Sequence, residues 1–270
     1  MNEAEWTPAE IAEIYDHSTL TADLFNDGQE HLGYWYDDDD EASVGEAAAR
    51  LTRKIADTLG LRPGEHVLDA GCGAGVAAVQ IAGEYGARVT GVTISPVGRD
   101  MARARAEAAG RSEQARFELG DYHALDFPEA HFDAVIEIEA LMHAVDLDKA
   151  LLELYRVLRP GGRITIAETT KVRPDAEVAM PFSREPVMGR QWVDNLTNAG
   201  FVPEEWIECG HRVFGHSGTR FPRHFETIRE DFVARFGEEL FDNIREGQGK
   251  WFALGTEYMG YTILSARKPA

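Results

Sequence analysis

Cysteine is scarce in this chain. Its 270 residues contain two, Cys72 and Cys209, which are too few for a disulfide framework or a cysteine metal cluster. The opening MNEAEWTPAE lacks the basic and apolar regions of a secretory signal peptide. No apolar run approaches the ~18 residues that typically cross a bilayer. We therefore expect a cytoplasmic protein without a membrane span and without a bound metal.

Positive charge is also in short supply. The chain has 27 basic and 47 acidic residues and a formal charge of −20, and such a field repels the phosphate backbones of nucleic acids. We therefore exclude DNA and RNA as substrates. The acidic run at 37–41 is interpreted as a solvated loop, since it lacks the spacing of a calcium-binding loop. A hydrophobic content of 44% suffices for one α/β domain with an inserted cap.

The most informative motif is the segment HVLDAGCGAG at 66–75, an apolar strand that breaks into alternating glycines. Gly71, Gly73 and Gly75 allow a sharp turn and close approach of the backbone to a flat ligand. An NAD site would require glycine where Val76 stands and an acidic residue about 20 positions on. A phosphate-binding loop would require a following Gly-Lys-Ser/Thr, which the sequence lacks.

Strands and helices alternate after residue 60, which predicts a doubly wound parallel sheet. The order is strand 66–70, helix 75–84, strand 88–92, helix 97–109, strands 116–120 and 132–138, helix 147–158 and strand 163–168. Pro160 and Gly161 are expected to stop the helix at 147–158. The irregular stretch 171–189 predicts a lid, followed by a helix at 189–200, a strand at 201–209, one or two helices within 222–254 and a last strand at 259–267. Capping boxes at Thr7–Glu10 and Ser43–Glu46 indicate two earlier helices.

The pattern D-x-G-x-G-x-G resembles motif I of the class I S-adenosylmethionine (SAM) methyltransferases. The resemblance implies an α/β, Rossmann-like sheet of seven strands, mostly parallel with the last antiparallel, and a helical cap. It divides the chain into an N-terminal cap segment (1–60), a SAM-binding core (61–170), an acceptor-binding cap or lid (171–254) and a terminal core strand (255–270). The cofactor residues that it implies are Asp69, Gly71, Gly73, Thr93, Ile94, Asp121, Tyr122, Glu137 and Glu139.

Several motifs narrow the resemblance to actinomycete-type methyltransferases of antibiotics, antibiotic sugars, ansamycins and indole alkaloids. They are IYDHST at 14–19, LGYW at 32–35, EALMHAVD at 139–146 and LRPGGRITIAE at 158–168. In this family Tyr15 would lie over SAM, and the turn with Trp35 would help to close the site. Ordinary aromatic packing between helices is an equally good interpretation of both side chains.

The resemblance makes His143 the general base for an acceptor hydroxyl, assisted by Glu168. Histidine suits this role because it titrates near neutrality. Glu139 becomes the better candidate for a carbon nucleophile. The predicted function is SAM-dependent transfer of a methyl group, preferably to oxygen, on a small and partly apolar natural product. The alternatives are C- or N-methylation of an indole or isoprenoid scaffold, or a SAM-binding catalyst of the same fold that does not methylate.

The cap segment leaves further alternatives open. His211, His216 and His224 alternate with arginines and either bind an acidic acceptor or form a charged helix face. Their spacing is not that of a zinc site. The N-terminal helix either covers its own active site or that of a second subunit in a homo-oligomer. Apolar side chains that would line an acceptor pocket, or otherwise belong to the core, are Met180, Phe182, Met188, Trp192, Phe214 and Trp251.

Overall fold

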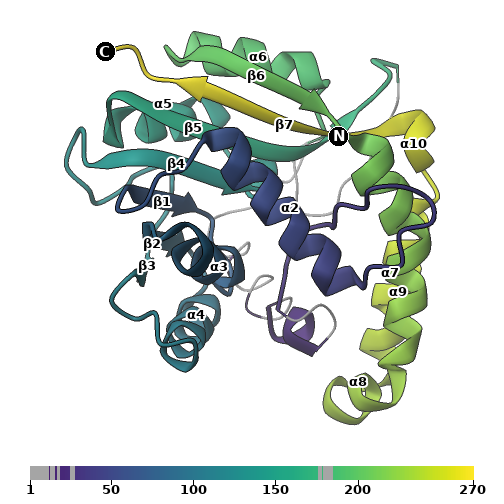
Figure 1. The fold of residues 1–270 in the computed structure, drawn as a ribbon. Coiled ribbons are helices and arrows are strands. Elements are labelled where there is room, and N and C mark those ends of the chain that lie inside the picture. Colours follow the sequence, from purple (N-terminus) through teal and green to yellow (C-terminus); the bar gives the residue numbers. More distant parts are fainter. Residues whose placement is uncertain (1–11, 13–15, 17–18, 25–27, 176–177, 179–184) are drawn as a thin grey trace.

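The computed structural model of the protein describes residues 12, 16, 19–24, 28–175, 178 and 185–270. Within these residues, seven strands form one sheet in the order β3-β2-β1-β4-β5-β7-β6 (Figure 1). The strands are β1 (His66–Ala70), β2 (Arg88–Thr93), β3 (Ala115–Leu119), β4 (Phe132–Ile138), β5 (Leu158–Lys171), β6 (Val202–Glu208) and β7 (Met259–Arg267). The first five pair in parallel, whereas β7 runs antiparallel to both β5 and β6. The predicted mixed sheet with an antiparallel last strand is confirmed.

Helices cover both faces of the sheet (Figure 1). One face carries α2 (Val44–Leu59), α3 (Val76–Tyr85) and α4 (Pro96–Ala108), and the other carries α5 (Leu147–Val157) and α6 (Gly189–Asn198). Because successive side chains of a strand point to opposite faces, Val67 and Ile136 join the first core, while Leu68 and Val135 join the second. Burial on both faces explains why these strands are continuously apolar.

The predicted capping box at Ser43–Glu46 begins α2, where the Ser43 hydroxyl accepts a hydrogen bond from the Glu46 amide. The box at Thr7–Glu10 lies outside the described residues. The helix predicted at 147–158 is α5, which ends at Val157, ahead of Pro160 and Gly161 as predicted. The strand that follows, β5, begins at Leu158 and not at 163, so that it includes these two residues. The pairing of β5 with β4 is irregular there, which accommodates a residue without an amide hydrogen.

The cap stands at one end of the sheet and contacts α2 (Figure 1). It comprises the short π-helix η2 (His211–Gly215), α7 (His216–Thr227), α8 (Arg229–Phe236), α9 (Glu238–Phe252) and α10 (Gly255–Tyr258). Within 222–254, where we predicted one or two helices, the structure has three, α7, α8 and α9. The helices are separate because the chain breaks at Ile228 and again at Gly237, whose φ is +90°. The cap has its own aromatic core, in which the Phe225 and Phe241 rings stack 4.5 Å apart.

In the described part of the chain, none of the helices combines the length and the apolar character needed to span a bilayer.

Candidate cofactor and catalytic site

The glycine loop follows β1 and has left-handed backbone conformations that glycine adopts readily. The φ angles are +90° at Gly71, +47° at Gly73 and +75° at Gly75. The amide of Gly71 donates to the Val92 carbonyl at 2.9 Å, which fixes the loop to the end of β2. A Cβ atom at Gly75 would lie 2.6 Å from the Cβ of Ala102, so this glycine is required for packing of α3 on α4. A Cβ atom at Gly71 would lie 2.4 Å from the Cβ of Ala140. Gly71 and Gly73 also border the hollows described next.

Two adjoining hollows open over this loop and share Gly71, Gly73 and Ala140. Residues 28–31, 69, 71–77 and 138–140 line the first hollow. The second is lined by residues 92–94 and by Gly120, Tyr122 and His143. Predicted site residues that the structure brings together here are Asp69, Gly71, Gly73, Thr93, Ile94, Tyr122, Glu139 and His143. They lie at the carboxyl ends of parallel strands, where ligands bind in open α/β sheets.

Asp121 lies between two residues of the second hollow, but its carboxylate is directed to a neighbour. Its Oδ1 accepts a hydrogen bond from the His123 amide at 2.9 Å and pairs with the His123 Nδ1 at 2.5 Å. The adjacent Tyr122 hydroxyl donates to the Ala140 carbonyl at 3.1 Å. The turn after β3 is thereby joined to the segment that follows β4. Tyr15 lies outside the described residues.

Two buried glutamates hold the short helix η1 (Leu141–His143), which carries His143. The Oε1 atom of Glu137 accepts hydrogen bonds from the Ala140 amide at 2.6 Å and the Leu141 amide at 2.7 Å. The Oε1 atom of Glu168 accepts one from the Met142 amide at 2.8 Å. Neither glutamate lines the two hollows. Their contacts are those of side chains that position His143.

Burial raises the pKa of several carboxyl groups at this edge of the sheet. It raises the pKa of Asp69 to about 7, and the nearby Glu137 charge adds to the effect. Burial and then the Glu137 charge place the pKa of Glu168 well above its usual value.

Glu139 combines a perturbed carboxyl group with a strained backbone. Burial raises its pKa to about 7, while the Leu32 amide, 3.0 Å from Oε1, and the nearby Tyr261 hydroxyl act in the opposite direction. Its φ of +51° is unfavourable for a residue with a side chain. Strain of this kind is concentrated at functional sites, where the surrounding structure enforces it. Glu139 lines the first hollow.

Glu30 is a site residue that the sequence did not reveal. Its Oε2 accepts a hydrogen bond from the Ala74 amide at 2.9 Å, and its Oε1 accepts one from the Thr19 hydroxyl at 2.5 Å. A Cβ atom at Gly73 would collide with this carboxylate. Glu30 just precedes the LGYW motif, but its spacing gives no indication that it would meet a loop more than forty residues away.

The structure also decides between interpretations of the aromatic residues. Trp35 is fully buried and packs on the His216 ring at 6.0 Å, away from both hollows, as ordinary core packing requires. Trp192 and Phe214 belong to the cores on opposite faces of the sheet. For these two side chains, the alternative that they belong to the core is confirmed. Met180 and Phe182 lie outside the described residues.

Comparison with known proteins agrees with this geometry. Residues 68–166, which contain the glycine loop and η1, match the family model described as a methyltransferase domain. The chain is 33% identical to 27-O-demethylrifamycin SV methyltransferase of Amycolatopsis mediterranei over 97% of its own length and 98% of that protein. It is 38% identical to the O-methyltransferase cnsE of Penicillium expansum, over 72% of this chain and 73% of that one.

A solved structure shares the fold over nearly its whole length. The [4+2]-cyclase SpnF superposes with a TM-score of 0.85 and 29% identity, covering 98% of each chain. Together, the mixed sheet, the glycine loop and full-length similarity to a named methyltransferase settle the identity of the fold and its cofactor. The chain belongs to the class I SAM-dependent methyltransferases.

Proposed function

We propose that this enzyme methylates a hydroxyl oxygen of a small, partly apolar natural product of secondary metabolism. The observation that carries the proposal is the similarity, over nearly the whole of both chains, to 27-O-demethylrifamycin SV methyltransferase. That name places the transferred methyl group on oxygen. The shorter match to cnsE, also named an O-methyltransferase, supports the same atom. Residues 171–254 would form the acceptor-binding cap. Three further points stay predictions: that the enzyme acts in the cytoplasm, that nucleic acids are not its substrates, and that it forms a homo-oligomer if the N-terminal helix covers a second subunit.

We assign the cofactor to the two adjoining hollows. Gly71 and Gly73 leave room for SAM at the shared wall, with Asp69 beneath them. Thr93, Ile94 and the turn at Asp121 and Tyr122 would hold the adenosine part, and the N-terminal Tyr15 would cover the cofactor. Glu139 would border the methionyl part. Glu137, which was predicted to do the same, is fully buried and lines neither hollow. SAM supplies a methyl group that is already activated on a sulfonium.

Glu30 extends the cofactor assignment. Its buried carboxylate reaches the first hollow beside Gly73, and we assign it to the α-ammonium group of SAM. A charge-assisted hydrogen bond of this kind typically contributes about 1.5–3 kcal/mol. The Ala74 amide keeps the carboxylate at the edge of the loop.

His143 is the proposed general base. It lines the second hollow on η1, and Glu137 and Glu168 fix the backbone of that turn. In this position the imidazole would accept the proton of the acceptor hydroxyl as its oxygen attacks the methyl group. Such general base catalysis contributes about 10²–10⁴ in rate. Glu139, in the neighbouring hollow, would be the base for a carbon nucleophile.

The experiment is transfer of a labelled methyl group from SAM to a panel of phenols, aliphatic alcohols, indoles and isoprenoids. We expect label on the hydroxyl compounds. With an active acceptor, His143→Ala should lower kcat about 100-fold or more and leave the Kd for SAM unchanged. His131→Ala removes a histidine that stacks on Phe127 outside both hollows and is the matched control. Normal turnover by His143→Ala would contradict the assignment.

The second candidate is a SAM-binding catalyst that does not methylate. It is favoured by the 29% identity to the [4+2]-cyclase SpnF over 98% of both chains. The same labelled assay separates the two. A cyclase would convert its substrate into an isomer of unchanged mass, with no label transferred and with SAM recovered intact.

A further inference from the structure

A cluster of three potential metal ligands lies between the acidic loop at 37–41 and the start of the cap. The Oδ1 atom of Asp38 lies 3.7 Å from the Nε2 of His211 and 3.6 Å from the Nε2 of His216. All three donor atoms lie within 4.8 Å of one another. Asp38 and His211 are exposed, whereas His216 is only 8% exposed. The cluster lies outside the residues that line the proposed cofactor site.

His216 has an unsatisfied polar atom directed at this cluster. Its Nε2 is buried and forms no hydrogen bond within the described residues. The 3.6 Å separation from Asp38 is too long for a hydrogen bond. On its other side the ring packs against Trp35, which fixes its position. Buried polar atoms without a partner are rare in folded proteins and point to an unseen ligand or ion.

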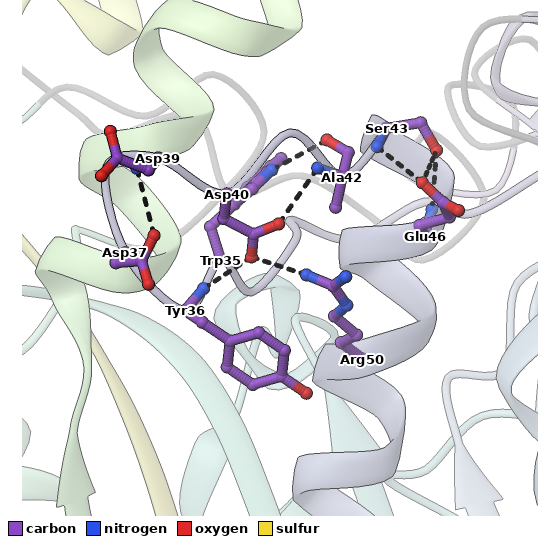
Figure 2. Close-up of polar contacts among 9 residues, drawn as sticks. All are labelled: Trp35, Tyr36, Asp37, Asp39, Asp40, Ala42, Ser43, Glu46 and Arg50. Carbon is purple, nitrogen blue, oxygen red and sulfur yellow. Dashed lines mark hydrogen bonds and ion pairs between the residues drawn. The ribbon is translucent and has the colours of Figure 1, made fainter.

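The acidic loop is ordered by its own hydrogen bonds (Figure 2). The Asp40 carboxylate accepts from the amides of Tyr36 at 2.8 Å and Ala42 at 3.0 Å, and pairs with Arg50 at 2.6 Å. Asp40 is therefore less exposed than the rest of the run, whose residues 37–39 and 41 are exposed, as predicted for a solvated loop. These bonds hold the loop near the cap and leave the Asp38 carboxylate for the two histidines.

We propose that Asp38, His211 and His216 bind one divalent transition-metal ion of the zinc type. Imidazole donors suit Zn²⁺, Co²⁺ and Ni²⁺, whereas Mg²⁺ and Ca²⁺ prefer oxygen ligands alone. Zinc–nitrogen and zinc–oxygen bonds of about 2.0–2.2 Å place neighbouring tetrahedral donors about 3.3–3.5 Å apart. The observed Asp38–histidine separations of 3.6 and 3.7 Å require a contraction of only a few tenths of an ångström. The two histidine donors lie within 4.8 Å of each other and would approach by at most about 1.4 Å. The ion ties the acidic loop to the cap.

Neither segment predicts this site by itself, because its ligands are far apart in the sequence. The acidic run has no calcium-loop spacing, and the two cap histidines are five residues apart on a short π-helix and the first turn of α7. Folding adds the third ligand from the other end of the chain. The open coordination positions face solvent, since Asp38 and His211 are exposed.

The test is titration of tag-free, EDTA-treated full-length protein with Co²⁺, followed by its visible absorption. We expect saturation at one Co²⁺ per chain, loss of the absorption on addition of Zn²⁺, and a higher Tm with Zn²⁺ present. Asp38→Asn and His211→Ala should each weaken Co²⁺ binding about tenfold or more. Both residues are exposed, so the metal-free variants should keep the Tm of the parent protein.

Two controls make the assignment specific. Asp37→Asn alters the neighbouring carboxylate of the loop, and His224→Ala removes a cap histidine outside the cluster. Both should bind Co²⁺ as the parent does. The proposal is overturned by absence of saturable Co²⁺ binding, by undiminished binding in Asp38→Asn and His211→Ala, by an equal loss in the controls, or by Mg²⁺ binding as tight as that of Co²⁺.

Discussion

Replacing Glu139 by glutamine should stabilise the ligand-free enzyme at pH 8. Burial raises the pKa of this carboxyl group from 4.5 to about 7, so between these values the folded state binds more protons than the unfolded state. Stability then falls as the pH rises through this window. The loss is absent below about pH 4.5 and fully developed above pH 7. Glutamine cannot ionise, so the Glu139→Gln enzyme does not undergo this loss of stability.

The expected gain in the free energy of unfolding follows from the same shift in the pKa of Glu139. Moving the pKa from 4.5 to about 7 corresponds to about 3 kcal/mol at pH 8. The side chain borders an open hollow, and screening by water lowers our expectation to about 2 kcal/mol. Glutamine retains the shape of the side chain, and its carbonyl can still accept the 3.0 Å hydrogen bond from the Leu32 amide. At pH 5 the gain should fall below about 1 kcal/mol.

Urea unfolding of both proteins at pH 5 and pH 8 measures this difference, with equal m-values as the requirement for comparison. Glu153→Gln is the matched control. Its hydrogen bonds with Arg156 hold the pKa of Glu153 below its usual value, so its replacement should destabilise the protein at pH 8 by less than about 1 kcal/mol. A Glu139→Gln enzyme no more stable than its parent at pH 8, or stabilised equally at both pH values, would refute the reasoning.

Two further substitutions test the glycine loop and its neighbour. Glu30→Gln should raise the Kd for SAM about tenfold or more by calorimetry, because it removes the carboxylate assigned to the ammonium group; an unchanged Kd would exclude that contact. Gly75→Ala should destabilise the protein by about 2–4 kcal/mol in urea, since its Cβ would meet that of Ala102 at 2.6 Å in addition to the strain of a φ of +75°. Gly60→Ala has a similar φ of +63° with empty space around it, and should lose only about 1 kcal/mol; equal losses would contradict the packing argument.

The order of strands and helices in the core could be predicted from the sequence because local pattern and fold agree there. Apolar runs such as 66–70 become strands buried on both faces, and Ser43 caps its helix as its motif indicates. The prediction was less accurate for the strand that follows α5. We expected it at 163–168, whereas β5 begins at Leu158, because Leu158 pairs with Phe132 ahead of the irregular stretch that holds Pro160 and Gly161.

The residues of the candidate site likewise differ in how well the sequence predicts them. Residues of the glycine loop and at the strand ends could be found because the sheet topology brings the carboxyl ends of parallel strands together. Glu30 and the cluster of Asp38 with the cap histidines depend on contacts between distant segments. No spacing in the sequence encodes such contacts. The different burial of Glu168 and Glu139 likewise depends on the packing of the folded molecule. Glu168 is 1% exposed, whereas Glu139 borders a hollow.

The density of carboxyl groups at this edge of the sheet has a consequence for turnover. Asp69 and Glu139 are held where burial opposes their negative charge, and a cationic ligand offsets that penalty. SAM carries a positive sulfonium in addition to its ammonium group. Methyl transfer converts the sulfonium into a neutral thioether, so the same carboxylates attract the product less strongly than they attract SAM. We therefore expect the electrostatics of this site to favour both capture of the methyl donor and release of its demethylated product.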